Sequence, residues 1–450
     1  MNPEQDEHER SRERISRALE AGTLGDVRRF LRQQEPGDIA HILASSPPRY
    51  RHVLWQLLEG SREAEVLNEL GEELRLDFLR AMDADRVALI TEELDDDDVA
   101  DILQQLPEAF TRQVLEAMDE QDRARLEKVM VYAEDTAGGL MNTDAITIRA
   151  DVTLDVVLRY LRRHDEIPEM TDVLIVVSRD DRYVGLLPVR TLLVSDPGCS
   201  VRELMITNRK AISTTTPSDE VARQFERNDW VSAPVVEEQG LVVGRITIDD
   251  VVDVIRDGGD HSLMSLAGLD EDDDTFAPAF KTARRRAVWL GVNLLTAFVA
   301  AAVINLFQDT IEKVVALAVL MPIVASMGGI AGAQSLTVLI RALAMGQVSR
   351  SNARWLVSRE LLAAALNGVI WALVVAAAAA AWFGDTTLGL IIAAAIIINL
   401  LTAGVTGALL PMTLRRLRID PALAGGVILT TVTDVVGFLS FLGLATAFYA

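Results

Sequence analysis

The second half of the chain is dominated by long apolar runs that are separated by short polar stretches. About 20 consecutive apolar residues are enough for a helix to cross a bilayer, and five runs reach that length. The pattern therefore predicts five transmembrane helices. The runs are Val288–Leu306, Val314–Leu343, Leu356–Trp382, Leu388–Met412 and Leu423–Tyr449.

The first 134 residues show a shorter amphipathic period, with apolar helical stretches separated by Asp and Pro. The hexapeptide Asp38–Leu43 (DIAHIL) returns as Asp98–Leu103 (DVADIL), and a proline-bearing turn and a second apolar stretch follow each copy. Such repeats are typical of an α-solenoid, in which short helices stack on their neighbours. We expect a helical domain that binds ligands or partners on its surface.

Residues 135–256 contain a second internal repeat, in which short β-branched strands alternate with amphipathic helices. Leu140-Met141 recurs as Leu204-Met205, and Val184-Gly185 recurs as Val243-Gly244. The pattern predicts two similar α/β domains that pair with each other. The expected strands include Val173–Val177 and Pro234–Val236, and the expected helices are Asp151–Arg163 and Ser218–Asn228.

These patterns divide the chain into six parts, and the fold class is multidomain. We expect a soluble α-solenoid, a tandem α/β pair, a linker helix and an all-α transmembrane domain of five helices. The expected boundaries are a tail at 1–24, the acidic helical domain at 25–134, the α/β domains at 135–200 and 201–256, the linker helix region at 257–280 and the transmembrane domain at 281–450.

Charge separates the two halves and orients the spans. Residues 281–450 hold 12 Lys and Arg against six Asp and Glu, which leaves 31 basic and 60 acidic residues, a net charge of −29, in residues 1–280. Bases precede the first span and follow the second and the fourth, as the positive-inside rule places cytoplasmic loops. The first residues are polar and resemble no secretory signal. We expect a multi-pass protein of the cell (inner) membrane, with a cytoplasmic N-terminal half and an external C-terminus.

Asp434 is the acid that lies near the middle of an apolar run. A carboxylate at this depth costs several kcal/mol and usually faces a bundle interior or a water-filled path. Thr430, Asp434 and Gly437 share one helix face, which would offer oxygen atoms to a hard cation. The alternative is a structural carboxylate that is bonded to a neighbouring helix.

The run Met327–Ser335 (MGGIAGAQS) is unusually rich in glycine for a spanning helix. Either helices pack closely there, as small residues allow, or the backbone opens and offers carbonyls to a pore. The GxxxG spacing of Gly328 and Gly332 favours close packing.

Together these segments resemble the MgtE family of magnesium channels, and the tandem repeat resembles a pair of CBS domains. The resemblance extends over about residues 25–450. The residues that carry it are Asp98–Leu103, Ala137–Met141 (AGGLM), Gly244–Asp250 (GRITIDD), Trp289-Leu290, Met321-Pro322, Gly328–Gln334, Asp420–Ala422 and Thr430–Gly437 (TTVTDVVG).

The resemblance implies a homodimer with an ion path between the subunits and with Asp434 as its main carboxylate. It further implies that Mg²⁺ is both the substrate and the regulator, bound between acidic soluble domains. The candidate ligands are Asp434, Asp420, Asp97, Asp98, Asp101, Asp219, Glu226, Asp229, Asp249, Asp250 and Asp253. For any one soluble acid, a solvated charge or a helix cap is the competing interpretation, and Asp95–Asp98 would partly cap a helix. We expect the acidic run Asp270–Asp274 to be a solvated linker.

Thr247 and Asp250 form a T-x-x-D spacing that, in CBS domains, resembles a site for the ribose of an adenine nucleotide, so ATP is a candidate ligand of the second domain. Three departures from the family pattern bear on function. Ile330 replaces the usual Asn, Val427 lies where a proline is usual, and Arg256–Asp260 (RDGGD) replaces a stretch that is usually rich in Glu.

The function expected from the sequence is a magnesium channel or transporter with feedback from intracellular Mg²⁺. A CBS-gated transporter of another divalent cation, such as cobalt or manganese, is the alternative that Ile330 keeps open, and a membrane-tethered nucleotide sensor is a third. An enzyme is not expected, since no nucleophile–base pair is evident, and neither is a nucleic-acid partner. Cys199 is the single cysteine, which excludes an internal disulfide.

Overall fold

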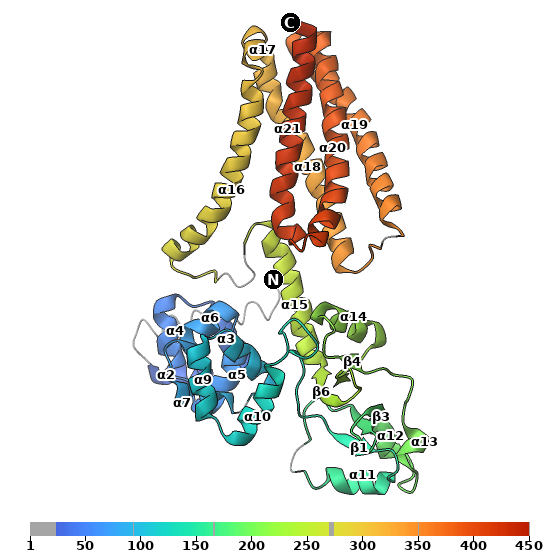
Figure 1. Cartoon of the computed structure of the whole chain (residues 1–450). Coiled ribbons are helices and arrows are strands. Elements are labelled where there is room, and N and C mark those ends of the chain that lie inside the picture. The colour runs from blue at the N-terminus through green and yellow to red at the C-terminus, as the bar shows by residue number, and fades with distance from the viewer. Residues whose placement is uncertain (1–23, 93, 165–166, 270–273, 350, 450) are drawn as a thin grey trace. The chain divides into compact units, whose positions relative to one another are not determined.

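The structure is a computed structural model that describes residues 24–449 except residues 93, 165–166, 270–273 and 350. The chain forms two compact units (Figure 1). The first contains the described residues up to Asp260 and the short segment 274–278. The second contains the described residues from His261 to Leu269 and those from Ala279 onwards.

Short helices build the N-terminal part of the first unit, as the sequence predicted. Proline starts α3 and α4, while the carboxylates of Asp83 and Asp119 accept backbone N–H groups at the starts of α7 and α10. The apolar residues of the two hexapeptides point into one core. The helices are α2 (Leu24–Leu31), α3 (Pro36–Ala44), α4 (Pro48–Trp55), α5 (Gly60–Asn68), α6 (Glu72–Leu79), α7 (Ala84–Thr91), α8 (Asp96–Gln104), α9 (Glu108–Ala117) and α10 (Glu120–Val129).

Two small sheets with the same topology follow, which confirms the α/β repeat. In each sheet the first strand pairs in parallel with the second, and the second pairs antiparallel with the third. The elements are β1 (Thr147–Arg149), α11 (Leu154–Leu161), β2 (Val173–Val177), β3 (Tyr183–Pro188), α12 (Val189–Val194), α13 (Val201–Leu204), β4 (Ile212–Ser213), α14 (Ser218–Asn228), β5 (Ser232–Val236) and β6 (Val242–Thr247).

The segment that leads into each domain pairs with the sheet of the other domain. Asn142 bridges Arg245 on β6, and Ile206 bridges Leu186 on β3. The repeated glycines permit this exchange, because a Cβ at Gly185 would lie 2.5 Å from the Ile206 carbonyl oxygen and one at Gly244 would lie 2.6 Å from that of Asn142. The two domains are therefore held together by backbone pairing as well as by apolar packing.

A buried ion pair joins the start of the chain to the segment 274–278. The two terminal guanidinium nitrogens of Arg51 on α4 donate to the Asp274 carboxylate, at 2.5 and 2.8 Å. The same guanidinium also donates to the carbonyl oxygens of Leu43, Ala44 and Ser46. The expectation of a solvated acidic run was therefore wrong for Asp274, while residues 270–273 lie outside the described residues.

The linker helix α15 (Ile248–Leu266) starts directly after β6 and crosses the boundary expected at residue 256 without interruption. Gly258 and Gly259 lie inside it and cause no break. The helix ends in a left-handed glycine, Gly268, and the Leu269 N–H returns to the Met264 carbonyl oxygen. The Trp289 ring covers Gly268 so closely that no Cβ would fit there.

The second unit contains five helices that are long and apolar enough to cross a membrane. The first begins nine residues before the predicted start, because the helical backbone continues through the basic stretch that includes Lys281 and Arg286. The polar stretch between the first two expected spans forms a short helix. The helices are α16 (Ala279–Asn305), α17 (Gln308–Lys313), α18 (Ala316–Ala344), α19 (Ala353–Phe383), α20 (Thr386–Arg416) and α21 (Pro421–Tyr449).

Helix α20 is the most buried of the five spans, and α18, α19 and α21 pack around it (Figure 1). Helix α16 contacts α21 and leaves most of its apolar surface exposed in the single chain. Pro322 and Pro411 lie within α18 and α20, both of which continue as helices.

Candidate cation sites

The carboxylates of α8 and of the first turns of α15 gather in the first unit. The apolar residues Val99, Ile102 and Leu103 turn α8 toward the helical core. Asp97, Asp98 and Asp101 belong to the same helix, and the charge of Asp250 on α15 raises the pKa of Asp97 and of Asp101. Six of the acids predicted from the sequence thus share one region, namely Asp97, Asp98, Asp101, Asp249, Asp250 and Asp253. We call them the acidic cluster.

Burial and mutual repulsion raise the pKa values of five of these carboxyl groups, namely Asp97, Asp98, Asp101, Asp250 and Asp253. Burial is the main cause, and neighbouring carboxylates add to it, so that the pKa rises to about 7 for Asp98, about 8 for Asp101 and about 7 for Asp250. Asp97 is 5% exposed, its pKa lies well above the usual value, and its Oδ1 has no hydrogen-bond partner. A cation placed among these groups would stabilise their charged forms and offset the repulsion between them.

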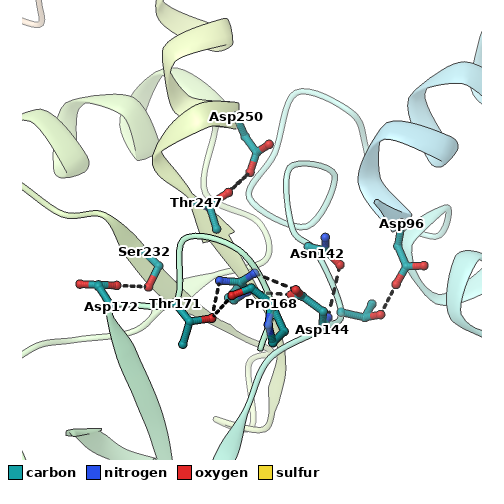
Figure 2. A network of polar contacts seen from close by, with 11 residues as sticks. Asp96, Asn142, Asp144, Pro168, Thr171, Asp172, Ser232, Thr247 and Asp250 are labelled. Atoms are coloured by element: carbon teal, nitrogen blue, oxygen red, sulfur yellow. Dashed lines mark hydrogen bonds and ion pairs between the residues drawn. The ribbon is translucent and has the colours of Figure 1, made fainter. Parts of the chain in front are cut away.

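Few basic groups offset this charge. Arg75 lowers the pKa of Asp98 and of Asp101, and Asn68 donates a 2.8 Å hydrogen bond to Asp98. Arg245 is occupied by Asp144, to which it donates two bonds of 2.7 Å (Figure 2). In the part of the chain that the structure describes, no three acidic, histidine or cysteine side chains converge as a metal-binding group. The carboxylates would therefore have to close around an ion.

The expected capping role of Asp95–Asp98 is met only in part. Asp95 occupies the N-cap position of α8 with extended backbone, but its side chain accepts no capping hydrogen bond. Asp96 instead accepts a hydrogen bond from the Thr143 hydroxyl (Figure 2). These acids are therefore held by tertiary contacts more than by the helix start.

The structure places the other predicted soluble acids away from the acidic cluster. Asp219 and Glu226 lie exposed on α14, where Asp219 pairs with Arg223. Asp229 is an exposed C-cap with a left-handed backbone. We find no contact that brings these three to the cluster within the described residues.

Thr247 and Asp250 are directly bonded, as the T-x-x-D spacing suggested. The Asp250 carboxylate accepts from the Thr247 hydroxyl at 2.8 Å and from the Thr247 N–H at 3.2 Å (Figure 2). Elsewhere in the second domain, the Arg209 guanidinium stacks 4.3 Å from the Trp230 ring and donates to the Ser232 carbonyl oxygen. Asp250 is thus shared between the T-x-x-D pair and the acidic cluster.

Asp434 lies on α21 and is half-buried in the single chain. Its carboxylate has no hydrogen bond or ion pair with any described residue, whereas the hydroxyls of Thr430 and Thr433 bond to carbonyl oxygens of their own helix. Thr430 is exposed, but Gly437 is buried against α20, so the predicted face is only partly open. The alternative of a carboxylate bonded to a neighbouring helix finds no contact among the described residues.

The glycine-rich run packs closely, as the spacing favoured. A Cβ at Gly328 would lie 2.3 Å from the Asn399 amide nitrogen, and one at Gly332 would lie 2.8 Å from the Leu429 side chain. Ile330, between them, is 58% exposed in the single chain. The helix remains intact throughout, so this run offers no opened backbone.

Asp420 caps α21, because its carboxylate accepts the N–H groups of Ala422 and Leu423 at 2.9 and 3.2 Å. The His261 ring nitrogen lies 3.3 Å from the same carboxylate. A capping carboxylate keeps lone pairs for a second partner, so the cap does not decide whether Asp420 binds an ion.

Two polar residues of the spans escaped the sequence analysis. Glu360 on α19 accepts a 2.9 Å hydrogen bond from Ser335, and Asn399 on α20 is fully buried. Glu360 was missed because it lies near an end of its helix and beside Arg359, as a charge at the membrane interface would. The signal for Asn399 was the single amide in the apolar run Leu388–Met412.

An acidic helical domain, a paired α/β repeat and five spanning helices define a multi-pass membrane protein with a large soluble portion. Family comparison assigns residues 34–135 to the MgtE intracellular N domain, 137–196 and 201–257 to CBS domains, and 321–444 to the divalent cation transporter domain of MgtE. The chain belongs to the MgtE family.

Its curated relatives include the magnesium transporter MgtE of Bacillus subtilis, 30% identical over 97% of this chain and 96% of that protein. The magnesium transporter MgtE of Thermus thermophilus is 32% identical over 96% of this chain and 97% of that protein. Among solved structures, the cytosolic domain of the Mg²⁺ channel MgtE in complex with ATP is 35% identical, covering 53% of this chain and 98% of that one, with a TM-score of 0.49.

Proposed function

We propose that this chain transports Mg²⁺ across the cell (inner) membrane and is closed by intracellular Mg²⁺ that binds in the acidic cluster. The observation that carries the transport step is Asp434, a carboxylate at mid-span without a partner among the described residues. Its relatives over nearly the full length are named magnesium transporters, which supports Mg²⁺ over cobalt or manganese. The relatives are transporters and give no support to catalysis.

Magnesium suits the groups that the chain offers. It prefers an octahedral shell of oxygen atoms, keeps several waters and is held through one or two carboxylates. In a homodimer, two Asp434 side chains near one axis would attract a hydrated divalent ion without holding it too tightly to leave. The largely exposed surface of α16 and the open side of α21 support this assembly.

The gate follows from repulsion. At low Mg²⁺, the carboxylates of α8 and α15 repel one another and favour separation of the helical domain from the CBS pair. Mg²⁺ bound between them would offset the repulsion and hold the closed arrangement. Asp97, Asp98, Asp101, Asp249, Asp250 and Asp253 are the proposed ligands, whereas Asp219, Glu226 and Asp229 would act only through their general charge.

The second CBS domain is proposed to bind ATP through Thr247 and Asp250. The bond between these two side chains orients the carboxylate at the end of β6, where a ribose could be held. Because Asp250 also belongs to the acidic cluster, nucleotide and Mg²⁺ would affect each other's binding there. We further propose the domain boundaries given above, a cytoplasmic N-terminal half and an external C-terminus.

Mg²⁺ flux into proteoliposomes tests the transport site. Asp434→Ala and Asp434→Asn should reduce flux at least tenfold while the protein keeps its oligomeric state on size exclusion. Asp309→Asn, an exposed acid on α17, is the control and should leave flux within twofold. Wild-type flux in both Asp434 variants would overturn the assignment. Competition with Co²⁺ and Mn²⁺ in the same vesicles tests the ion.

A further inference from the structure

Asn399 is a polar side chain enclosed at mid-span. It lies on α20 with no exposed surface, and its amide nitrogen donates a 2.8 Å hydrogen bond to the Val324 carbonyl oxygen of α18. Its amide oxygen has no hydrogen-bond partner. Among the described residues of the five spans, only Thr433 is another polar side chain without exposed surface, and its hydroxyl bonds to its own helix.

Glycines on two other helices make room for this amide. A Cβ at Gly328 of α18 would lie 2.3 Å from the Asn399 amide nitrogen, and one at Gly437 of α21 would lie 2.7 Å from it. Alanine fits at neither position unless the amide moves. Three helices therefore meet at one side chain, and no wider residue replaces either glycine without separating them.

A hydrophobic side chain would fill the same space at lower cost. Burying an amide whose oxygen is unpaired carries a desolvation penalty that the single hydrogen bond to the Val324 carbonyl offsets only in part. Unlike an apolar side chain, the amide makes a directional hydrogen bond. It fixes one turn of α18, because Gly328 is the residue whose N–H bonds to the Val324 carbonyl in a regular helix.

Both contacted turns lead directly to the proposed ion path. Gly437 follows Asp434 by three residues on α21, and Gly328 precedes Ile330 by two on α18. A helix transmits a rotation or a shift at one turn to the next turn with little loss. The position of Asn399 between α18 and α21 therefore sets how far apart, and at what rotation, the two path helices stand.

We propose that Asn399 is a positioning residue for the ion path, which holds Asp434 and position 330 at the separation that admits a hydrated divalent ion. The proposal rests on the proposed function of Asp434. It adds that selectivity among divalent ions depends on a residue that touches no ion.

The test measures Mg²⁺ flux and its inhibition by Co²⁺ in proteoliposomes, with flux normalised to the amount of folded oligomer on size exclusion. Asn399→Ala should lower normalised flux at least fivefold and change the Co²⁺ concentration for half inhibition at least threefold. Asn399→Ser, which keeps a short donor, should recover part of both. A merely structural residue would change the yield of folded protein and leave the inhibition constant unaltered.

A double-mutant cycle tests the contact itself. Gly437→Ala should lower normalised flux at least fivefold in the wild-type chain but less than twofold in the Asn399→Ala background, where the shortest contact, 2.7 Å to the amide nitrogen, is gone. Gly426→Ala on the same helix, where an added Cβ meets nothing within 4 Å, is the control. Additive effects, or unchanged inhibition by Co²⁺ in Asn399→Ala, would overturn the proposal. Failure of Asp434→Ala to reduce flux would instead overturn the proposed function.

Discussion

Protonation should close the soluble unit even without divalent ions. The pKa values of Asp98, Asp101 and Asp250 are raised in the closed arrangement, so this arrangement binds protons that the separated domains release. Its stability from these groups is complete below the ordinary Asp pKa of 3.8 and is lost as the pH rises through about 7 to 8. In Mg²⁺-free buffer, acidification therefore favours closure, and alkaline pH favours separation.

The size of the effect follows from the same values. Between pH 8 and pH 6, one group of pKa near 7 shifts the closure equilibrium about tenfold, and all three together shift it by on the order of 10³. Because the three carboxyls interact, the measured shift should fall between these limits. Saturating Mg²⁺ at pH 8 should produce the same closure, since the ion replaces the protons.

Energy transfer between two labels can follow closure in the full-length protein in detergent. Cys199 in the first CBS domain is the single cysteine of the chain, and Leu89→Cys would add a second label at an exposed position of the helical domain. Efficiency in chelator should rise from pH 8 to pH 6. The double variant Asp98→Asn/Asp101→Asn should be largely closed already at pH 8.

Asp219→Asn is the matched control, because this acid is exposed and pairs with Arg223 outside the acidic cluster. It should keep the wild-type response to pH. An efficiency that stays constant from pH 8 to pH 6 in the wild-type chain would refute the electrostatic account of the gate. An unchanged pH response in the double variant would show that other groups titrate.

Three further substitutions test separate parts of the structure. Ile330→Asn should strengthen discrimination against Co²⁺ and Mn²⁺ in flux competition, because an amide can hold the hydration shell of the ion; unchanged competition would exclude position 330 from the path. Gly244→Ala should place a Cβ 2.6 Å from the Asn142 carbonyl oxygen and destabilise the CBS pair by about 2 kcal/mol or more, measured by urea unfolding against a neutral Gly25→Ala control. Arg51→Ala should leave the mostly buried Asp274 carboxylate without its guanidinium partner, which costs about 3 kcal/mol and speeds chymotryptic cleavage after Phe276; cleavage at the wild-type rate would contradict it.

The sequence predicted the domain order, the repeat and the five spans because each depends on a local period of apolar residues. The ends of helices were harder to predict from the sequence. The basic stretch before Val288 interrupts the apolar run but not the helical backbone, so α16 starts earlier. The exchange of leading segments between the CBS domains was missed, because Gly185 and Gly244 reveal a close backbone approach only once the partner strand is known.

The residues of the candidate sites, like the helices, could be predicted from the sequence only in part. Nine soluble acids were named as candidate ligands from their chemistry and from the family pattern. The structure brings six of them together on α8 and the start of α15, and it places the other three on α14 and its C-cap. Asp274 was misjudged, since a run of acids is normally solvated and only the distant Arg51 makes one of them buried. Asn399 belongs to no recognisable motif, because its role depends on contacts with Gly328 and Gly437 on two other helices.

The pair between Arg51 and Asp274 can be regarded as the closure of a very long loop. The two residues are 223 positions apart, and closing a flexible loop of that length costs on the order of 5 kcal/mol in chain entropy. A buried ion pair supplies no more than about that amount. The contact therefore persists only while the domains between its ends are already folded and docked, so that the loop to be closed is short and stiff. Its presence is a collective property of the soluble unit, and its loss should be among the first signs that the unit has come apart.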